Sequence, residues 1–264
     1  MRRHVIITAI LFTAVSLAAA GKDQAVWAQG RHQLLTDVLS AHVSNGHVNY
    51  ARLCADGRLD AYTAQLNSTD PAQLPSADAR FAFWLNTYTA YSLSAICAKY
   101  PIDSVNDLHF GGMLFAVATG RSVWDKPLVR VNGRKYTLKE VDHEILRKQY
   151  ADPRIQFAIA CGAVGCGPVP QEAYEAEQLD AQLDRQARAF INDPRSNRFD
   201  EARQRAVLSP LFKWSRQDFG RSEDDVLLFA ARYLPPDLSR NIQTDPGKWD
   251  VEYGEYDLRL DDAK

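Results

Sequence analysis

The sequence lacks the features that divide a chain into modules or bind it to nucleic acid. It has no Gly/Ser-rich or Pro-rich linker, no internal repeat and no low-complexity tract. Its 31 basic and 33 acidic residues are mixed, without the strongly basic patch that nucleic-acid binding requires. Beyond the N-terminus, no segment approaches the ~20 apolar residues of a membrane span. We therefore expect one domain over residues 21–264, no nucleic-acid partner and no stable membrane span after signal cleavage.

The first 20 residues have the pattern of a secretory signal peptide. Residues 1–4 are basic, residues 5–20 are apolar, and Ala18, Ala19 and Ala20 precede Gly21 as small residues precede a cleavage site. A second cleavage motif ends at Ala28, and no cysteine for lipid attachment follows the apolar stretch. The sequence predicts export to the periplasm or secretion, with a retained anchor as the alternative.

The hydrophobic patterning predicts an α+β fold, predominantly helical, with a small sheet. Residues 80–99 carry apolar side chains on every side, which is typical of a central buried helix. Thr137 and Glu140 form a capping-box pattern that predicts a following helix. Other helices are expected over 32–43, 59–66, 171–192 and 224–233, a short strand within 46–50, short strands and turns over 110–136, and a hairpin over 131–136.

The segment 155–170, IQFAIACGAVGCGPVP, is the strongest candidate for a functional site. Its apolar start, residues 155–160, has the length and β-branched content of a buried strand that ends at Cys161. The glycines and prolines that follow permit positive φ and a close approach to a ligand, and they stiffen the exit of the loop.

The four cysteines leave the chemistry of this loop open. An even cysteine count in an exported chain favours disulfides, and Cys161–Cys166 is the simplest pair. A thiolate nucleophile at either position is the alternative, whereas the Cys-x4-Cys spacing argues against thioredoxin-type exchange. A zinc site is disfavoured because no further Cys or His stands at finger-like spacing. We expect no metal and no cofactor.

A second polar cluster follows Thr137, where Glu140, His143, Glu144 and Arg147 recur at helical spacing. This spacing makes His143 a candidate general base that Glu140 or Glu144 orients. The alternative is an ordinary solvated helix face with charge pairs.

Asn86 is an amide within the nearly all-apolar central helix and needs hydrogen-bond partners if it is buried. It is a candidate for orienting a catalytic imidazole or binding substrate. Bracing of a neighbouring loop is the alternative.

Several ordered blocks of the chain resemble the domain-of-unknown-function family 547, over about residues 32–233. They are GHVNYARL (46–53), FAFWLNTYTAY (81–91), YTLKEVDHEILR (136–147), DPRIQFAIACGAVGCGPVP (152–170), AYEAEQLDAQLDRQARAFIND (173–193) and LSPLFKWSRQDF (208–219). The resemblance implies family membership and agrees with export, but the family name assigns no activity.

The chain departs from this family at three positions. Members typically have histidine where Gln156 stands, asparagine where Thr89 stands and proline where Gly167 stands. Glutamine does not shuttle protons near neutral pH. If the family uses this histidine as a base, then either His143 has to act as the base in this chain or the protein is a binding relative without turnover.

Two functions follow from these residues. One is a cysteine-dependent hydrolase or acyltransferase in which Cys161 or Cys166 attacks an amide or thioester, with His143 as base. The other is a non-catalytic binding or interaction module with a structural Cys161–Cys166 disulfide, whose partner is a small molecule or a peptide. Thiol–disulfide exchange is a third possibility.

Overall fold

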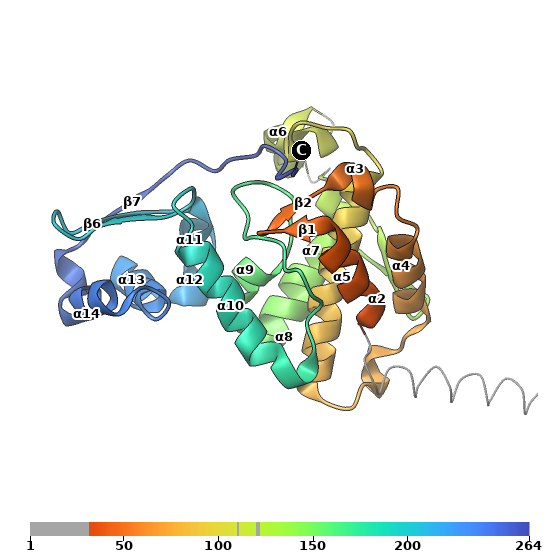
Figure 1. Cartoon of the computed structure of the whole chain (residues 1–264), viewed down its shortest axis with the longest axis horizontal. Coiled ribbons are helices and arrows are strands. Elements are labelled where there is room, and N and C mark those ends of the chain that lie inside the picture. The colour runs from red at the N-terminus through yellow and green to blue at the C-terminus, as the bar shows by residue number, and fades with distance from the viewer. Residues whose placement is uncertain (1–31, 110, 120–121, 264) are drawn as a thin grey trace, which may run out of the picture.

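The computed structural model describes residues 32–109, 111–119 and 122–263 and shows a predominantly helical α+β fold (Figure 1). The predicted signal peptide lies outside the described residues. The helices are α2 (Gln33–His42), α3 (Tyr50–Leu53), α4 (Arg58–Ser68), α5 (Ala77–Cys97), α6 (Gly112–Thr119), α7 (Leu138–Glu140), α8 (Lys148–Tyr150), α9 (Ile155–Ala158), α10 (Leu179–Ile191), α11 (Pro210–Trp214), α12 (Arg216–Phe219), α13 (Glu223–Ala231) and α14 (Pro236–Thr244). A π-helical segment, Val141–Arg147, joins α7 to α8.

The strands form three small sheets. Two are antiparallel hairpins, and in the third β6 pairs antiparallel with β5 and parallel with β7. The strands are β1 (Val43–Ser44), β2 (His47–Val48), β3 (Val129–Val131), β4 (Arg134–Tyr136), β5 (Arg198–Asp200), β6 (Arg205–Leu208) and β7 (Asp250–Tyr253).

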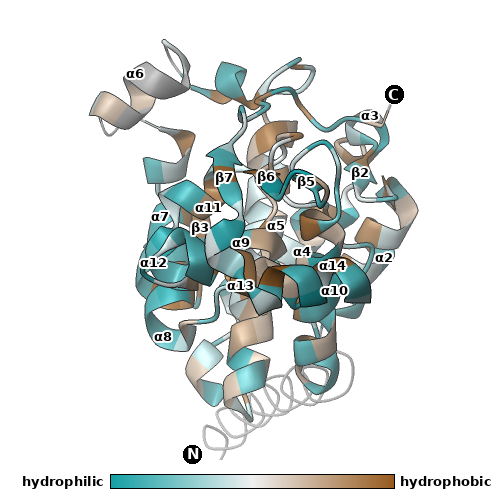
Figure 2. Cartoon of the chain, turned by 90° about the vertical axis from the view of Figure 1, so that its left-hand side faces the viewer, coloured by the Kyte–Doolittle hydropathy of each residue, from teal (hydrophilic) through white to brown (hydrophobic). Residues whose placement is uncertain are grey.

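Helix α5 is the central buried helix that the sequence predicts. The Ser76 hydroxyl caps it by accepting a 3.0 Å hydrogen bond from the Ala79 amide. Sixteen of its residues, Ala79 to Ile96 with few interruptions, are buried on all sides, so no face of the helix is left for solvent. In the view of Figure 2, α5 appears in the middle of the molecule, with α12 on one side and α10 on the other.

A second hydrophobic cluster holds the C-terminal part of the chain. Phe157 of α9 stacks on Phe190 of α10, with ring centroids 4.7 Å apart, and also contacts Phe212 of α11. Helices α13 and α14 and the β5–β6–β7 sheet complete this part (Figure 1).

Residues 254–263, named here the C-terminal strap, return from β7 to the first part of the fold (Figure 1). The strap forms isolated β-bridges from Asp262 to Val48, from Arg259 to Ser104 and from Leu260 to Ala163. Residues that are far apart in sequence therefore meet at the cysteine loop.

The predicted strand over 155–160 is wrong. Residues Ile155–Ala158 form α9, and the chain becomes extended only at Ile159. A short apolar run fits a buried helix as well as a buried strand. In the helix, Phe157 packs against the aromatic rings of α10 and α11.

Three other expectations need correction. The 110–136 region contains a helix, α6, in addition to strands and turns. Helix α10 begins at Leu179 and not at 171, because the preceding segment is held in loop form by bonds to Asn86. The helix expected over 224–233 is α13, which ends at Ala231, and a further helix, α14, starts at Pro236, where proline is well tolerated at the first position.

The predicted hairpin over 131–136 is confirmed. Asn132 and Gly133 have φ of 49° and 72°, as a type I′ turn requires. Among the described helices, none combines the length and the apolar character of a membrane span.

Candidate functional site

The two cysteines of the candidate loop are bonded to each other. Cys161 and Cys166, five positions apart, form a disulfide. The hydroxyl of Tyr256 lies 3.3 Å from Cys161 Sγ and 3.1 Å from Cys166 Sγ. In this oxidised form neither sulfur is a free thiolate, and the group that contacts both is a phenol.

The C-terminal strap holds the cysteine loop through backbone hydrogen bonds. The amides of Val164 and Gly165 donate to Arg259 O and Asp257 O, each at 2.9 Å, and the Asp261 amide donates to Gly162 O at 2.8 Å. A Cβ on Gly165 would lie 2.9 Å from the Tyr256 ring, and one on Gly162 would lie 2.3 Å from the Ile96 side chain. Glycine is thus required at both positions for this close packing.

Tyr256 is itself covered by an exposed aromatic ring. Trp214, at the end of α11, lies with its ring centroid 5.0 Å from that of Tyr256, and its exposed fraction is 62%. Burial of the Tyr256 hydroxyl raises its pKa, so the phenol stays protonated at neutral pH. The disulfide therefore has a permanent O–H donor beside it.

The second disulfide has a different setting. Cys54 and Cys97 are 43 positions apart and join the end of α3 to the end of α5. Both cysteines pack against the hydrophobic core that contains the buried residues of α5.

The two glutamates predicted to orient His143 are engaged elsewhere. Glu140 completes the predicted capping box, because its carboxylate accepts a 2.7 Å hydrogen bond from the Thr137 amide. Glu144 is exposed and pairs with Lys148 at 3.0 Å. His143 is half-exposed and instead has Nε2 3.7 Å from Asp142 and Nδ1 3.3 Å from Arg147.

The π-helical segment explains why Asp142 joins this cluster. A π-helix has a longer hydrogen-bond period than an α-helix and is frequent at functional sites. In this segment the Asp142 side chain is only 18% exposed, and its Oδ1 has no hydrogen-bond partner among the described residues. Burial raises the pKa of this carboxyl, while the charges of His143 and Arg147 oppose the rise. The helical period of 3.6 residues does not predict that the Asp142 side chain is buried beside His143.

Gln156 connects the His143 helix to the C-terminal part. Its side-chain amide donates to Asp218 at 2.7 Å and accepts from the Ser215 hydroxyl at 3.0 Å. Arg147 donates to the other oxygen of Asp218 at 2.9 Å. Asp218 was not predicted from the sequence, because nothing in its local pattern places it beside Gln156.

Tyr88 of α5 is buried near this polar cluster. Burial raises its pKa, and the Asp142 carboxylate adds to the rise.

Asn86 braces a loop. Its side chain donates to Tyr174 O at 2.8 Å and accepts from the Tyr174 amide at 2.9 Å. These two bonds use its donor and acceptor together, as a buried amide requires.

Residues 71–191 match the model of a family described as "Protein of unknown function, DUF547". These residues form a DUF547 segment of the chain. No curated protein and no solved structure shows significant similarity to it. The matched segment is shorter than the 32–233 span over which the sequence blocks resemble the family.

All six predicted site residues lie within the DUF547 segment, whereas much of what surrounds them comes from outside it. The outside residues are Trp214, Ser215, Asp218 and Tyr256. They belong to the C-terminal part and the strap.

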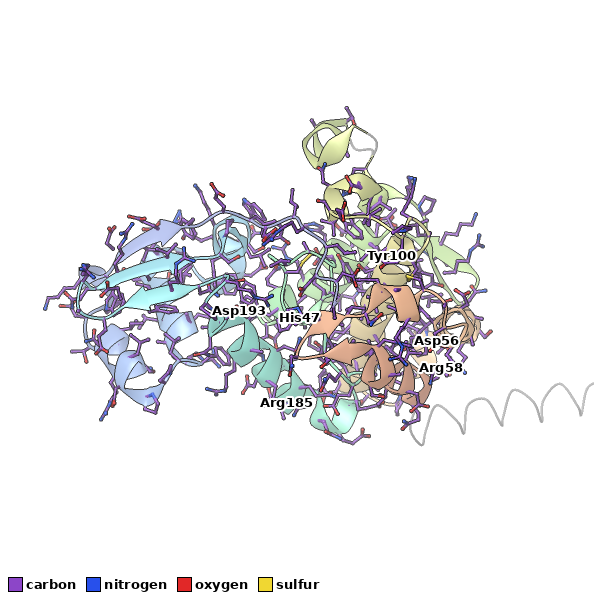
Figure 3. The ribbon with its side chains drawn as sticks, turned by 45° about the horizontal axis from the view of Figure 1, so that its top comes forward. His47, Asp56, Arg58, Tyr100, Arg185 and Asp193 are labelled. Carbon is purple, nitrogen blue, oxygen red and sulfur yellow. A yellow bond between two sulfur atoms is a disulfide. The ribbon has the colours of Figure 1, made fainter. Side chains whose placement is uncertain are left out.

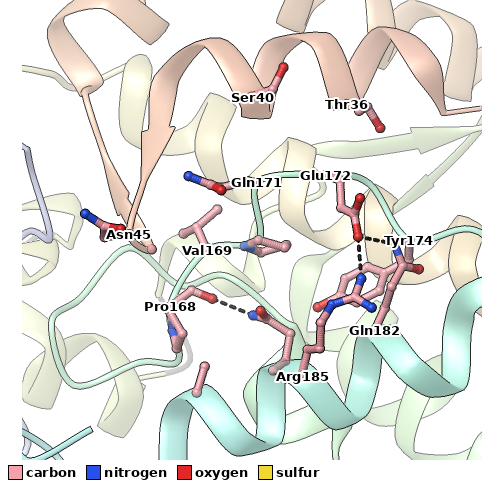
Figure 4. Close-up of a pocket in the computed structure, with 14 residues that line it drawn as sticks. Thr36, Ser40, Asn45, Pro168, Val169, Gln171, Glu172, Tyr174, Gln182 and Arg185 are labelled. Carbon is pink, nitrogen blue, oxygen red and sulfur yellow. Dashed lines mark hydrogen bonds and ion pairs between the residues drawn. The ribbon is translucent and has the colours of Figure 1, made fainter.

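The cysteine loop, which lies in the DUF547 segment, leads into a cleft of about 500 Å³ (Figure 4). Helix α2, the turn at Asn45 and helix α10 form its other sides. Gln186 donates to Pro168 O at 2.6 Å and so fixes the loop against α10. Arg185 and Glu172 form an ion pair in the cleft lining. The structure thus places a hollow with polar groups beside the stapled loop.

Proposed function

We propose that this protein is an exported, non-catalytic binding module that takes a short peptide or a peptide-like small molecule in the cleft between α2 and α10. The observation that carries the proposal is the bonding of the predicted catalytic side chains. Cys161 and Cys166 are joined, Asn86 holds Tyr174, Glu140 caps a helix, and Glu144 pairs with Lys148. Among the six predicted site residues, only His143 makes neither a disulfide nor a short hydrogen bond, and it has contacts of 3.3 and 3.7 Å instead.

The volume of the cleft and the polar groups that line it fit a ligand of this kind. Its volume of about 500 Å³ lies within the range of small-molecule sites. The Gln171 side chain donates one hydrogen bond to Val43 O, and an amide has a second donor and an acceptor to offer. Peptide groups require donors and acceptors of this neutral kind. The Arg185–Glu172 pair supplies both charges that peptide termini need.

The disulfide contributes by restricting the loop that lines the cleft. Cys166 is two positions from Pro168, and the wall continues through Glu172. A short ring closed by a disulfide reduces the freedom of the unbound loop, which lowers the entropy cost of binding.

Export is part of the proposal. Two disulfides are typical of an oxidising compartment. The N-terminal signal pattern supports the same location, in the periplasm or outside the cell.

A cysteine-dependent hydrolase is the alternative, with His143 as base. It requires reduction of Cys161–Cys166 before a thiolate exists. No observed contact joins His143 to either sulfur, so the binding module is the function that the geometry favours.

Filling the cleft tests the proposal. Ala189 is exposed on α10 and lines the cleft, so Ala189→Trp should occupy it without disturbing the core. Ala64→Trp, at an exposed position of α4, is the matched control. A library of tri- and tetrapeptides is screened by thermal shift, and hits are measured by calorimetry. We expect hits that bind the parent and Ala64→Trp equally and lose at least tenfold in affinity to Ala189→Trp. Equal binding to all three proteins would place the site elsewhere.

A further inference from the structure

The surroundings of the Cys161–Cys166 disulfide indicate more than a staple. Both cysteines are partly exposed, and one phenol lies within hydrogen-bond distance of both sulfurs. The exposed Trp214 ring adjoins that phenol. The disulfide thus lies in a partly exposed loop, next to an aromatic surface on which a partner can rest.

We propose that Cys161–Cys166 is an exchangeable redox disulfide that accepts two electrons from a dithiol, with Tyr256 as the group that stabilises the leaving thiolate. This proposal rests on the contacts of the sulfurs, the strap and Trp214, and it does not require a ligand in the cleft.

The exchange proceeds in two balanced steps. A thiolate of the dithiol attacks Cys161 Sγ, a new S–S bond forms, and the Cys161–Cys166 bond breaks with its electron pair on Cys166 Sγ. The second thiol of the donor, after losing its proton to solvent, then attacks the donor's own sulfur in the mixed disulfide and releases Cys161 as a thiolate. The donor ends as a disulfide, the protein gains two electrons, and its two sulfurs take protons from solvent.

Tyr256 acts in the first step. Its oxygen is 3.1 Å from Cys166 Sγ, the closer of the two sulfurs, and its O–H can donate to the negative charge that develops there. Hydrogen bonds to a charged partner are stronger than those between neutral groups. A more stable leaving thiolate speeds exchange. Because burial raises the pKa of the phenol, this donor is present at neutral pH, where the exchange is measured.

The chain contains its own control in Cys54–Cys97. That disulfide closes a loop of 43 positions between two helices, and no hydroxyl contact to its sulfurs is found among the described residues. In the folded protein it should therefore exchange more slowly than Cys161–Cys166.

Reduction kinetics of the folded full chain test the proposal. The protein is incubated with dithiothreitol at neutral pH, quenched by alkylation at intervals, and each cysteine is quantified by peptide mapping. We expect Cys161–Cys166 to open at least about tenfold faster than Cys54–Cys97. Tyr256→Phe should slow the opening of Cys161–Cys166 about tenfold. The melting temperature of the variant and the rate at which Cys54–Cys97 is reduced should stay unchanged.

Tyr253→Phe is the matched control, because Tyr253 ends β7 three positions before Tyr256 and its ring contacts Lys213. It should leave both rates unchanged. Opening of the two disulfides at one common rate, that of global unfolding, would overturn the proposal. An unchanged rate of opening of Cys161–Cys166 in Tyr256→Phe would show that the phenol does not assist the exchange. A faster rate would show that the phenol shields the sulfurs. Either result would also overturn the proposal.

Discussion

His47 and Asp261, 214 positions apart, are joined by a 2.6 Å hydrogen bond from the imidazole Nδ1 to the carboxylate. The bond ties the end of the C-terminal strap to β2. Asp261 also lies 3.8 Å from Arg195. Arg195 in turn pairs with Asp193, and Tyr100 donates to Asp262 of the strap at 3.1 Å; His47, Asp193 and Tyr100 are labelled in Figure 3. The strap is therefore held at its end by several side chains.

Asp261→Asn should weaken this attachment. The variant keeps the shape of the side chain and loses the charge, so we expect the free energy of unfolding to fall by about 1 kcal/mol. Urea denaturation followed by tryptophan fluorescence measures the change. Asp237→Asn removes a carboxylate from an exposed ion pair with Arg240 and should change stability little. Equal effects of the two substitutions would mean that the strap contact adds no stability.

The two disulfides should differ in their contributions to stability. Chain entropy predicts a loss of about 4 kcal/mol when the Cys54–Cys97 bond is removed and about 2 kcal/mol for Cys161–Cys166, since the second closes a far shorter loop. The double serine variants of each pair, compared by urea denaturation, measure these losses. A larger loss for the short ring would show that Cys161–Cys166 acts mainly through native-state contacts such as those with the strap.

Asp142→Asn should stabilise the protein at neutral pH. Burial raises the pKa of this carboxyl above its ordinary 3.8. Between the ordinary and the raised pKa the folded state binds more protons than the unfolded state, so stability falls as pH rises through that window. The neutral variant avoids this loss and should gain on the order of 1 kcal/mol at pH 7.

The gain of Asp142→Asn should disappear at pH values below 3.8, where the parent carboxyl is protonated in both states. Melting temperatures across pH 3 to 8 give the comparison, with Asp237→Asn as the exposed control. A variant that is less stable than the parent at pH 7 would show that His143 and Arg147 more than compensate the burial of Asp142.

The sequence predicts local features of this fold better than long-range ones. The all-round apolar pattern of α5, the Asn132–Gly133 turn and the Thr137 capping box depend on neighbouring residues and are confirmed. The strand assigned to 155–160 is wrong, because the packing of Phe157 against Phe190 lies outside the local pattern.

The same limit applies to the site. The Cys161–Cys166 pair was among the predictions, since the two residues are neighbours in sequence. Tyr256, 90 positions from Cys166, and Asp218, 62 positions from Gln156, are brought in by the C-terminal part of the fold. No periodicity or motif points to them.

Peptide mapping of the mature protein, alkylated without reduction across a pH series, is the most direct measurement of the oxidised loop. We expect linked Cys54–Cys97 and Cys161–Cys166 peptides and no alkylation of any cysteine in the absence of a reductant. Rapid alkylation of Cys161 or Cys166 at a pH well below the ~8.5 pKa of an ordinary thiol would contradict the binding module. A thiolate-dependent enzyme would then be the function to pursue.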